Sequence, residues 1–381
     1  MSGPLTGVRI IELAGLGAAP YGCMMLADMG AEVVRIERPG GAGVDTPQDS
    51  PVLRNRRSLI LDLKRKEAVD AVLAMVEKAD ILVEGFRPGV AERLGLGPDV
   101  CMARNGKLVY GRITGWGQDG PLAQTAGHDL NYLALSGMLK QIGPTGGKPV
   151  VPLNVIGDYG GGGLLMAFGV MCALYEARQS GKGQVVDAAM IDGALSFMAL
   201  YFGYRDQGQF FDQAGSHMLG GGAHYYNVYE TKDGGFLSVA PLEPNFYLTF
   251  VDKLGLDKER YRPAGYPAHS EQTVVLDWPA LKSELTEIFK TRSRDQWYEL
   301  FKDSDVCVFP VLTMDEAIEH PHNTARQAFI EVGGVVQQAP APRFSRSVPQ
   351  TPEPPPLPGA DMKSIAADWQ LDPAIFDQLN A

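Results

Sequence analysis

The sequence predicts an α/β fold built on a parallel sheet, followed by a smaller domain of mixed α and β structure. Residues 8–13 have the pattern of a buried strand, residues 32–37 have that of a second strand, and a helical pattern at residues 20–29 lies between them. This order makes a βαβ unit. Further strands are predicted at residues 58–63, 81–84 and 107–111, and a further helix at residues 67–79. Such alternation is typical of a doubly wound sheet.

The middle of the chain changes its hydrophobic period. Apolar residues recur at helical spacing at 130–138 and 160–178, where many glycines and alanines allow close helix packing. At residues 226–239 the period becomes two around a glycine-rich turn, which predicts a β-hairpin. We expect the second domain to start there. Its helices are predicted at 245–254, 281–290 and 294–302, the last with a capping box formed by Ser293 and Gln296.

The carboxyl-terminal part is rich in proline. Residues 339–358 contain many of the 27 prolines and are expected to run extended over a surface. Asp372 and Pro373 predict the start of a final short helix.

Composition indicates an ordinary soluble globular protein. Hydrophobic residues make up 45% and charged residues 21% of the 381 residues, a length that favours two domains. The formal net charge of −11 argues against nucleic-acid binding but permits local arginine clusters for an anionic ligand.

Cysteine usage and hydropathy indicate a cytoplasmic protein. The four cysteines show no C-x-x-C spacing, so neither a zinc site nor a disulfide framework is predicted, and a reducing compartment is expected. No secretion signal is apparent, and the longest apolar stretch, residues 164–175, is shorter than a bilayer-spanning helix. We therefore expect no membrane association.

A glycine-rich segment partly imitates the dinucleotide-binding fingerprint. Gly15 and Gly17 follow a predicted strand, but Pro20 replaces the third glycine. Glu37, at the ribose position of the fingerprint, is followed by Arg38, which suits phosphate better than a ribose diol. NAD binding is therefore disfavoured.

No metal is expected, because the pair His320 and His322 has no evident third ligand.

Arginines cluster near the ends of predicted strands, where open α/β sheets bind ligands. The clusters are Arg54, Arg56 and Arg57, and then Arg87 and Arg93. Guanidinium groups match phosphate oxygens, so the clustering favours anion binding. For any single arginine the alternative is a solvated surface with scattered ion pairs.

Three further residues have side chains suited to acid–base chemistry. His128 stands at the start of a predicted helix, Asp158 precedes a glycine-rich helix start, and Glu243 follows the predicted hairpin. Taken alone, each is also explained as an ordinary capping or helix-start residue.

The order of several segments resembles the class III CoA-transferase superfamily over nearly the whole chain. Within it, the chain is most similar to the alpha-methylacyl-CoA racemases, because His128 stands where the transferase branch usually carries tyrosine. The segments that carry the resemblance are GVRIIELAG, IERPG, LRNRRSLILDLK, VEGFRPGVAERLG, GRITGWGQDGP, GHDLNYLALSG, VIGDYGGGG, GKGQVVDAAMIDG, GGGAHYYNVYETKDG, PLEPNFY, DSDVCVFPVL and APAPRFSR.

The resemblance implies an intertwined homodimer with active sites between subunits. It implies a Rossmann-like, CoA-binding large domain, a smaller α+β domain, and two linkers that join them. The boundaries it implies are 1–200 for the large domain, 201–224 for a linker, 225–325 for the small domain, and 326–381 for the return linker and the last part of the large domain.

The resemblance also implies site residues. His128 and Asp158 match the catalytic base pair, Glu243 matches the glutamate that supports the histidine, and Asp129 matches its acidic neighbour. Contacts with substrate or CoA are implied for Arg38, Leu61, Gly85, Arg87, Arg93, Gly127, Asp129, Leu130, Asn131, Tyr132, Asn154 and Tyr226.

The implied reaction interconverts (2R)- and (2S)-2-methylacyl-CoA thioesters through an enolate-like intermediate. Inversion needs a base on one face of the α-carbon and an acid on the other, which His128 and Asp158 can supply. Backbone N–H groups, with the glycines around Asp158 as candidates, would stabilise the enolate oxygen. CoA is part of the substrate, so no separate cofactor is expected.

Two alternatives remain open. In a CoA-transferase, Asp158 would act as a nucleophile and form an aspartyl anhydride, although His128 argues against this reading. In a non-catalytic acyl-CoA-binding dimer, the base pair would be broken, whereas both residues are present here.

Overall fold

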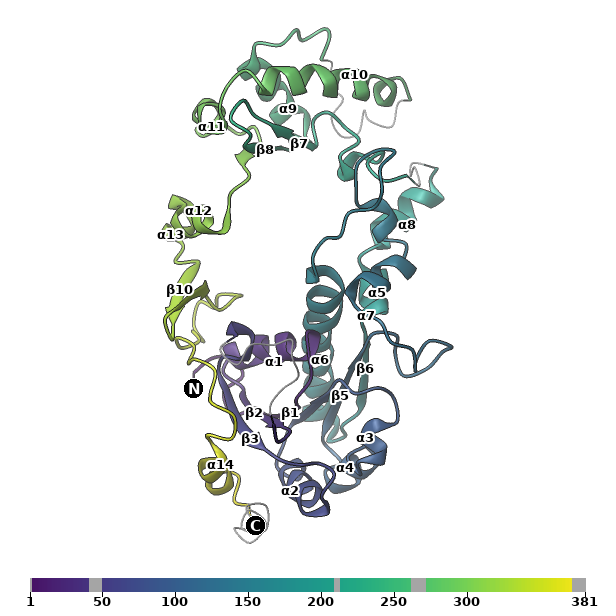
Figure 1. The fold of residues 1–381 in the computed structure, drawn as a ribbon, viewed down its shortest axis with the longest axis vertical. Helices are drawn as coiled ribbons and strands as arrows, with labels where there is room; N and C mark the ends of the chain where they lie inside the picture. Colours follow the sequence, from purple (N-terminus) through teal and green to yellow (C-terminus); the bar gives the residue numbers. More distant parts are fainter. Residues whose placement is uncertain (1, 41–49, 209–212, 262–271, 372–381) are drawn as a thin grey trace. The chain divides into compact units, whose positions relative to one another are not determined.

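The computed structural model describes residues 2–40, 50–208, 213–261 and 272–371 (Figure 1). The chain forms two compact units. The first unit comprises 1–136, 152–197 and 322–381, and the second comprises 137–151 and 198–321. The predicted domain boundaries at 200, 225 and 325 stay predictions, because compactness within a unit does not show that it folds alone. The predicted start at Asp372 lies outside the described residues.

A six-stranded parallel sheet forms the centre of the first unit. Its strand order is β3-β2-β1-β4-β5-β6, the order of doubly wound nucleotide-binding folds. The predicted α/β fold with a parallel sheet is thus confirmed. The strands are β1 (Arg9–Leu13), β2 (Glu32–Glu37), β3 (Arg56–Ile60), β4 (Ile81–Glu84), β5 (Val109–Thr114) and β6 (Val185–Ala189).

Helices cover both faces of this sheet. Neighbouring residues of one strand point to opposite faces, so Ile11 packs in one core cluster and Ile10 in the other. The first cluster includes residues of α2, α4 and α14, and the second includes residues of α1 and α6. The helices are α1 (Ala18–Asp28), α2 (Lys66–Val76), α3 (Val90–Arg93), α4 (Pro98–Arg104), α5 (Asp129–Leu135), α6 (Leu165–Ser180), α7 (Met190–Ser196) and α14 (Met362–Asp368).

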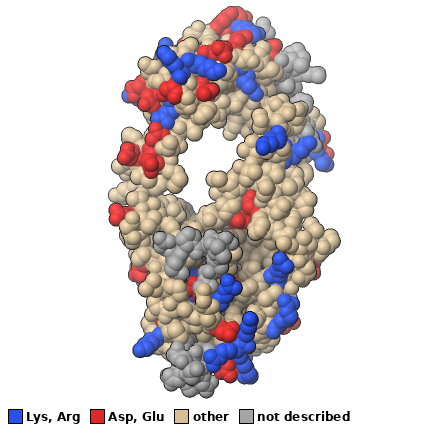
Figure 2. Space-filling model, in the orientation of Figure 1, with Lys and Arg blue, Asp and Glu red and all other residues tan. Residues whose placement is uncertain are grey.

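Short elements complete the unit. They are the 3-10 turn η1 (Pro51–Leu53), the π-helix η3 (Val155–Leu164), and the hairpin of β10 (Phe329–Val332) and β11 (Val335–Gln338), while α13 (Pro321–Ala325) lies at the boundary with the second unit. Residues 339–357 form neither helix nor strand, in agreement with the predicted extended segment. Figure 2 shows charged side chains of both signs over α2 and α4, at the lower end of the view.

The first arginine cluster is not a ligand site, contrary to the expectation from the sequence. Arg54 is 1% exposed and binds both carboxylate oxygens of Asp28, and Arg56 binds Glu12 at 3.1 Å. Arg57 pairs with Glu32 at 2.6 Å. These arginines lie at the amino end of β3, whereas ligands bind at the carboxyl ends of parallel strands. Arg54 and Arg56 neutralise buried carboxylates, whereas Arg57 pairs with carboxylates that are partly exposed.

The continuous helical segment Val155–Ser180, made of η3 and α6, is long and apolar enough to cross a membrane by length and composition. The same properties belong to a core helix, and α6 packs against β5, β6 and α1. This segment therefore gives only weak evidence for a membrane span.

The second unit has a three-stranded antiparallel sheet, β7-β8-β9, covered by helices. The predicted hairpin is confirmed as β7 (Asn227–Glu230) and β8 (Phe236–Val239), and Ser293 and Gln296 form the predicted capping box. The other elements are η2 (Leu139–Gln141), α8 (Ala199–Asp206), η4 (Met218–Gly220), α9 (Pro244–Leu254), α10 (Gln272–Phe289), α11 (Arg294–Phe301), β9 (Val308–Pro310) and α12 (Met314–Glu319).

His224 is buried without charge in the core of the second unit. It is 0% exposed, and its Nε2 lies 2.6 Å from the hydroxyl of Tyr247. Burial, assisted by the charge of Lys282, lowers the pKa of His224 from 6.5 to about 3. The folded protein therefore keeps this imidazole neutral at a pH where an unfolded chain protonates it.

Acid is accordingly expected to destabilise the second unit through His224. Between pH 6.5 and about 3 the unfolded chain binds a proton that the folded chain does not, so the free energy of unfolding falls as pH falls. Urea midpoints at pH 7.5 and 4.5 should show a smaller acid decrease for His224→Gln than for the wild type. The exposed His322, changed to Gln, should keep the wild-type slope; equal slopes in all three proteins would contradict this account.

Candidate active site

His128 lies at the start of α5, at the carboxyl edge of the sheet. It is exposed, its backbone is extended, and its backbone N–H donates to Oδ1 of Asn131 at 3.0 Å. Tyr132 donates from its hydroxyl to the carbonyl oxygen of Gly127 at 2.5 Å and packs edge-on against Trp116, with ring centroids 4.9 Å apart. Asn131 and Tyr132 therefore fix the backbone that presents His128.

Asp158 lies in the π-helix η3, a rare form that is frequent at functional sites. The glycine run in η3 lets it approach α1 closely. A Cβ on Gly163 would lie 2.5 Å from the carbonyl oxygen of Ala18, so only glycine fits there. Tyr21 of α1 stacks on Tyr159 with ring centroids 4.4 Å apart. Close packing on α1 thus sets the position of Asp158.

Asp129 joins the two elements that carry His128 and Asp158. It is 4% exposed, and its Oδ2 accepts the backbone N–H groups of Gly157 at 2.6 Å and Asp158 at 2.8 Å. A Cβ on Gly157 would lie 2.7 Å from this oxygen, which explains the glycine. Asp129 follows His128 directly, so this contact holds the start of α5 against the start of η3.

The surroundings of Asp158 favour its protonated form. Burial raises the pKa of the Asp158 carboxyl, and the nearby charge of Asp129 adds to the rise. The amide of Asn154, 3.3 Å from Oδ2, and the charge of His128 act in the opposite direction. The net rise means that the Asp158 carboxyl keeps its proton to a higher pH than an ordinary aspartate does. Burial, with these two carboxylates, also raises the pKa of Tyr132 to about 12.

His128 and Asp158 line one cleft of about 660 Å³, together with Tyr132 and Asn154. A second cleft, of about 270 Å³, shares Leu16, Gly127, His128 and Tyr132 with the first and is lined further by residues of the 85–88 turn. A third, of about 500 Å³, lies over the carboxyl ends of β1, β2 and β3. Leu16 lines all three, so the clefts adjoin. A long ligand can follow them.

The structure brings most of the predicted site residues of the first unit to these clefts. Arg38 and Leu61 line the third cleft, and Gly85 and Arg87 line the second. Four predicted residues are absent from the described lining of the clefts: Asp129, Leu130, Asn131 and the exposed Arg93. Glu243, at the start of α9, and Tyr226 belong to the second unit.

Sequence reasoning missed Leu16, Phe86, Trp116 and Met190 as lining residues. Phe86 and Trp116 follow β4 and β5 directly, so the rule that ligands bind at carboxyl strand ends could have identified them. Among the described residues, no group of three or more His, Cys, Asp or Glu side chains could hold a metal ion.

Comparisons with known proteins place the chain in a family over most of its length. Residues 5–362 match the sequence profile of "CoA-transferase family III". The chain is 41% identical to the mouse protein "Alpha-methylacyl-CoA racemase" over 91% of its own length and 87% of that protein, and 39% identical to the human protein of the same name over 86% and 82%.

More distant relatives include transferases. The Acetobacter aceti "Acetyl-CoA:oxalate CoA-transferase" is 30% identical over 88% of this chain and 87% of that protein. The crystal structure of a CAIB/BAIF family protein from Brucella suis superimposes with a TM-score of 0.81 at 25% identity, and it covers 97% of this chain and 100% of that chain.

Proposed function

The chain belongs to CoA-transferase family III, and within that family we propose that it acts as an alpha-methylacyl-CoA racemase, interconverting the (2R) and (2S) forms of 2-methylacyl-CoA thioesters. The observation that carries this proposal is the pairing of His128 with Asp158 in one cleft, at the end of three adjoining clefts. The identity to mammalian racemases supports it further.

The proposed mechanism uses the two side chains in turn. Neutral His128 removes the α-proton of one enantiomer, and protonated Asp158 returns a proton to the opposite face; the roles exchange in the reverse direction. The raised pKa of Asp158 supports its role as an acid, because the carboxyl keeps its proton to higher pH.

The enolate oxygen requires hydrogen-bond donors, and the geometry revises the sequence expectation about them. The N–H groups of Gly157 and Asp158 donate to Asp129, so these two members of the glycine loop are not the donors. The first N–H groups of a helix lack partners within the helix. We therefore assign the role to the N–H group of Asp129, the first residue of α5, which directly follows the cleft-lining His128.

Asp129→Asn is expected to lower kcat about tenfold with little change in KM. The neutral amide accepts the N–H groups of Gly157 and Asp158 more weakly than a carboxylate does, which loosens the alignment of the base pair. Steady-state racemisation kinetics measure the effect. A variant with wild-type kcat would show that this contact does not align the pair.

The proposed CoA position follows the clefts. The nucleotide part lies in the third cleft with Arg38 and Leu61, and the pantetheine part passes Gly85 and Arg87 to bring the thioester to Gly127 and His128. Arginine guanidinium groups match the phosphate oxygens of CoA. A contact from Arg93 stays part of the proposal, since its exposed side chain on α3 follows the same turn.

We also propose the intertwined homodimer, in which Glu243 supports His128 and Tyr226 borders the pocket across subunits. An apolar stripe supports a partner surface on the first unit. Leu164, Phe168 and Tyr175 lie on one side of the η3–α6 helix and are 48%, 65% and 71% exposed. Figure 2 shows the nearby surface over α5 and α7 largely without charged side chains.

Phe168→Asp is expected to convert the dimer to a monomer at micromolar concentration, because burying an unpaired carboxylate in an apolar interface is costly. Gel filtration with light scattering measures the mass. Val100→Asp is the matched control, since Val100 is an exposed apolar residue of α4 outside the stripe, at 43% exposure. A wild type that is itself a stable monomer would refute the dimer.

A CoA-transferase, with Asp158 as nucleophile, is the alternative. The family description and the 30% identical transferase favour it, but less strongly than the racemases at 41% and 39%. Dependence of the reaction on an added carboxylic acid distinguishes the two.

We propose a cytoplasmic location, in keeping with four cysteines that form no disulfide.

A further inference from the structure

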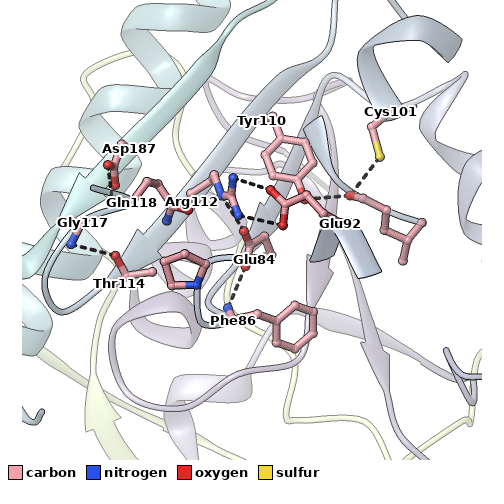
Figure 3. A network of polar contacts seen from close by, with 12 residues as sticks. Glu84, Phe86, Glu92, Cys101, Tyr110, Arg112, Thr114, Gly117, Gln118 and Asp187 are labelled. Carbon is pink, nitrogen blue, oxygen red and sulfur yellow. Dashed lines mark hydrogen bonds and ion pairs between the residues drawn. The ribbon is translucent and has the colours of Figure 1, made fainter. Parts of the chain in front are cut away.

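An ion-pair network with two buried members and one exposed member adjoins the turn at residues 85–88, which lines two of the clefts (Figure 3). Arg112 of β5 is 7% exposed, and its neighbour on β4, Glu84, is 0% exposed. Arg112 Nε donates to Glu84 Oε1 at 2.9 Å, and Nη1 donates to Oε1 of Glu92 on α3 at 2.8 Å. One guanidinium thus joins two strand ends to the helix that follows them.

The network reaches the turn through Glu84. The other oxygen of Glu84 accepts the backbone N–H of Phe86 at 2.7 Å, and Glu92 lies in α3, directly beyond the turn. Both ends of residues 85–88 are therefore tied to Arg112. Burial raises the pKa of Glu84, and Arg112 and the Phe86 N–H oppose the rise, so Arg112 helps to keep this carboxylate charged.

The turn lines the path proposed for CoA. Phe86 lines both the second and the third cleft, while Gly85, Arg87 and Pro88 line the second. A shift of the turn would change the passage between these clefts but leave His128 and Asp158 in place, because those two residues are held by Asp129 and α1.

We propose that Arg112 is a positioning residue for the CoA part of the substrate: through Glu84 and Glu92 it fixes the 85–88 turn. This inference rests on the proposed function. The proposed role of Arg112 concerns the binding of CoA and not the chemistry at the α-carbon. Among the described residues, its ion-pair network contacts neither His128 nor Asp158.

The test compares two substrates that carry the same 2-methylacyl group, one on CoA and one on N-acetylcysteamine, which lacks the nucleotide and most of the pantetheine. Arg112→Met is expected to raise KM for the CoA thioester about tenfold, with kcat within about twofold. For the short thioester, kcat/KM should stay within about twofold of the wild type. Equal losses with both substrates, or an unchanged KM for the CoA thioester, would overturn the proposal.

Two further variants keep the test decisive. Arg104→Met is the control, because Arg104 forms an exposed ion pair with Glu77 and should have no effect on either substrate. Should Arg112→Met fail to fold by circular dichroism, Glu92→Gln decides instead, since it leaves the Arg112–Glu84 pair intact. It should raise KM for the CoA thioester about threefold, and an unchanged KM would again overturn the proposal.

Calorimetric binding of CoA distinguishes failure of this inference from failure of the proposed function. A wild type that binds CoA but racemises neither thioester would contradict the racemase. The inference would still be tested by the Kd for CoA, which should be about tenfold weaker in Arg112→Met and unchanged in Arg104→Met.

Discussion

Replacing His128 by Ala, or Asp158 by Asn, is expected to lower the rate of racemisation about a thousandfold, because each removes one of the two groups that must face the α-carbon. The overall fold should be preserved, since His128 is exposed and Asp158 is only half-buried. Each variant keeps one base. We therefore expect each to exchange the α-hydrogen of only one enantiomer with deuterated solvent, with retention of configuration.

Chiral chromatography and mass spectrometry of the recovered thioester measure inversion and exchange separately. The two variants should select opposite enantiomers, because the two groups act on opposite faces. Asn154→Ala is the control, since Asn154 donates a hydrogen bond to Asp158 but transfers no proton in the proposed mechanism. It should retain inversion at a reduced rate. Full racemisation by either single-base variant would contradict the two-base mechanism.

Gly163→Ala is expected to lower the free energy of unfolding by about 3 kcal/mol and to remove most activity. The added Cβ would lie 2.5 Å from the carbonyl oxygen of Ala18 and 2.9 Å from the backbone nitrogen of Gly22, so α1 and η3 must separate. Asp158 moves with η3. For a unit of this size the loss corresponds to a decrease in Tm of roughly 6 °C, which calorimetry measures.

Gly106→Ala provides the comparison. Gly106 has open space where a Cβ would be and no left-handed backbone conformation, so both Tm and activity should be unchanged. If Gly163→Ala and Gly106→Ala had equal Tm values, the close contact between α1 and η3 would not be what positions Asp158.

The parallel sheet could be predicted because its first two strands are short and each contains neighbouring β-branched residues, Ile10 and Ile11 in β1 and Val33 and Val34 in β2. β1 and β2 are buried on both faces, which leaves an unmistakable pattern in the sequence. β6 has only two buried residues in its five, and periodicity did not identify it. The π-helix could not be predicted either, because its hydrogen bonding leaves no distinct hydrophobic period; the sequence indicated only a helix from residue 160.

The positions of the candidate catalytic residues could be predicted from the sequence, but the contact that brings them together could not. Helix-start positions of His128 and Asp158 follow from local sequence, but the contact that joins them, from Asp129 to the backbone of residues 157 and 158, spans 28 and 29 positions. The prediction that the first arginine cluster binds a ligand was wrong for a similar reason. Its partners Glu12 and Asp28 are distant in sequence, and only the fold brings them to Arg54 and Arg56.

The central claim is tested most directly by incubating the wild-type protein with one enantiomer of a 2-methylacyl-CoA in deuterated water, with no acceptor acid present. Chiral analysis and mass spectrometry of the thioester follow the reaction. The proposed racemase predicts epimerisation with the gain of one deuterium at the α-carbon. A thioester that stays unchanged until a carboxylic acid is added, and then transfers its CoA to that acid, would contradict the racemase and establish a transferase.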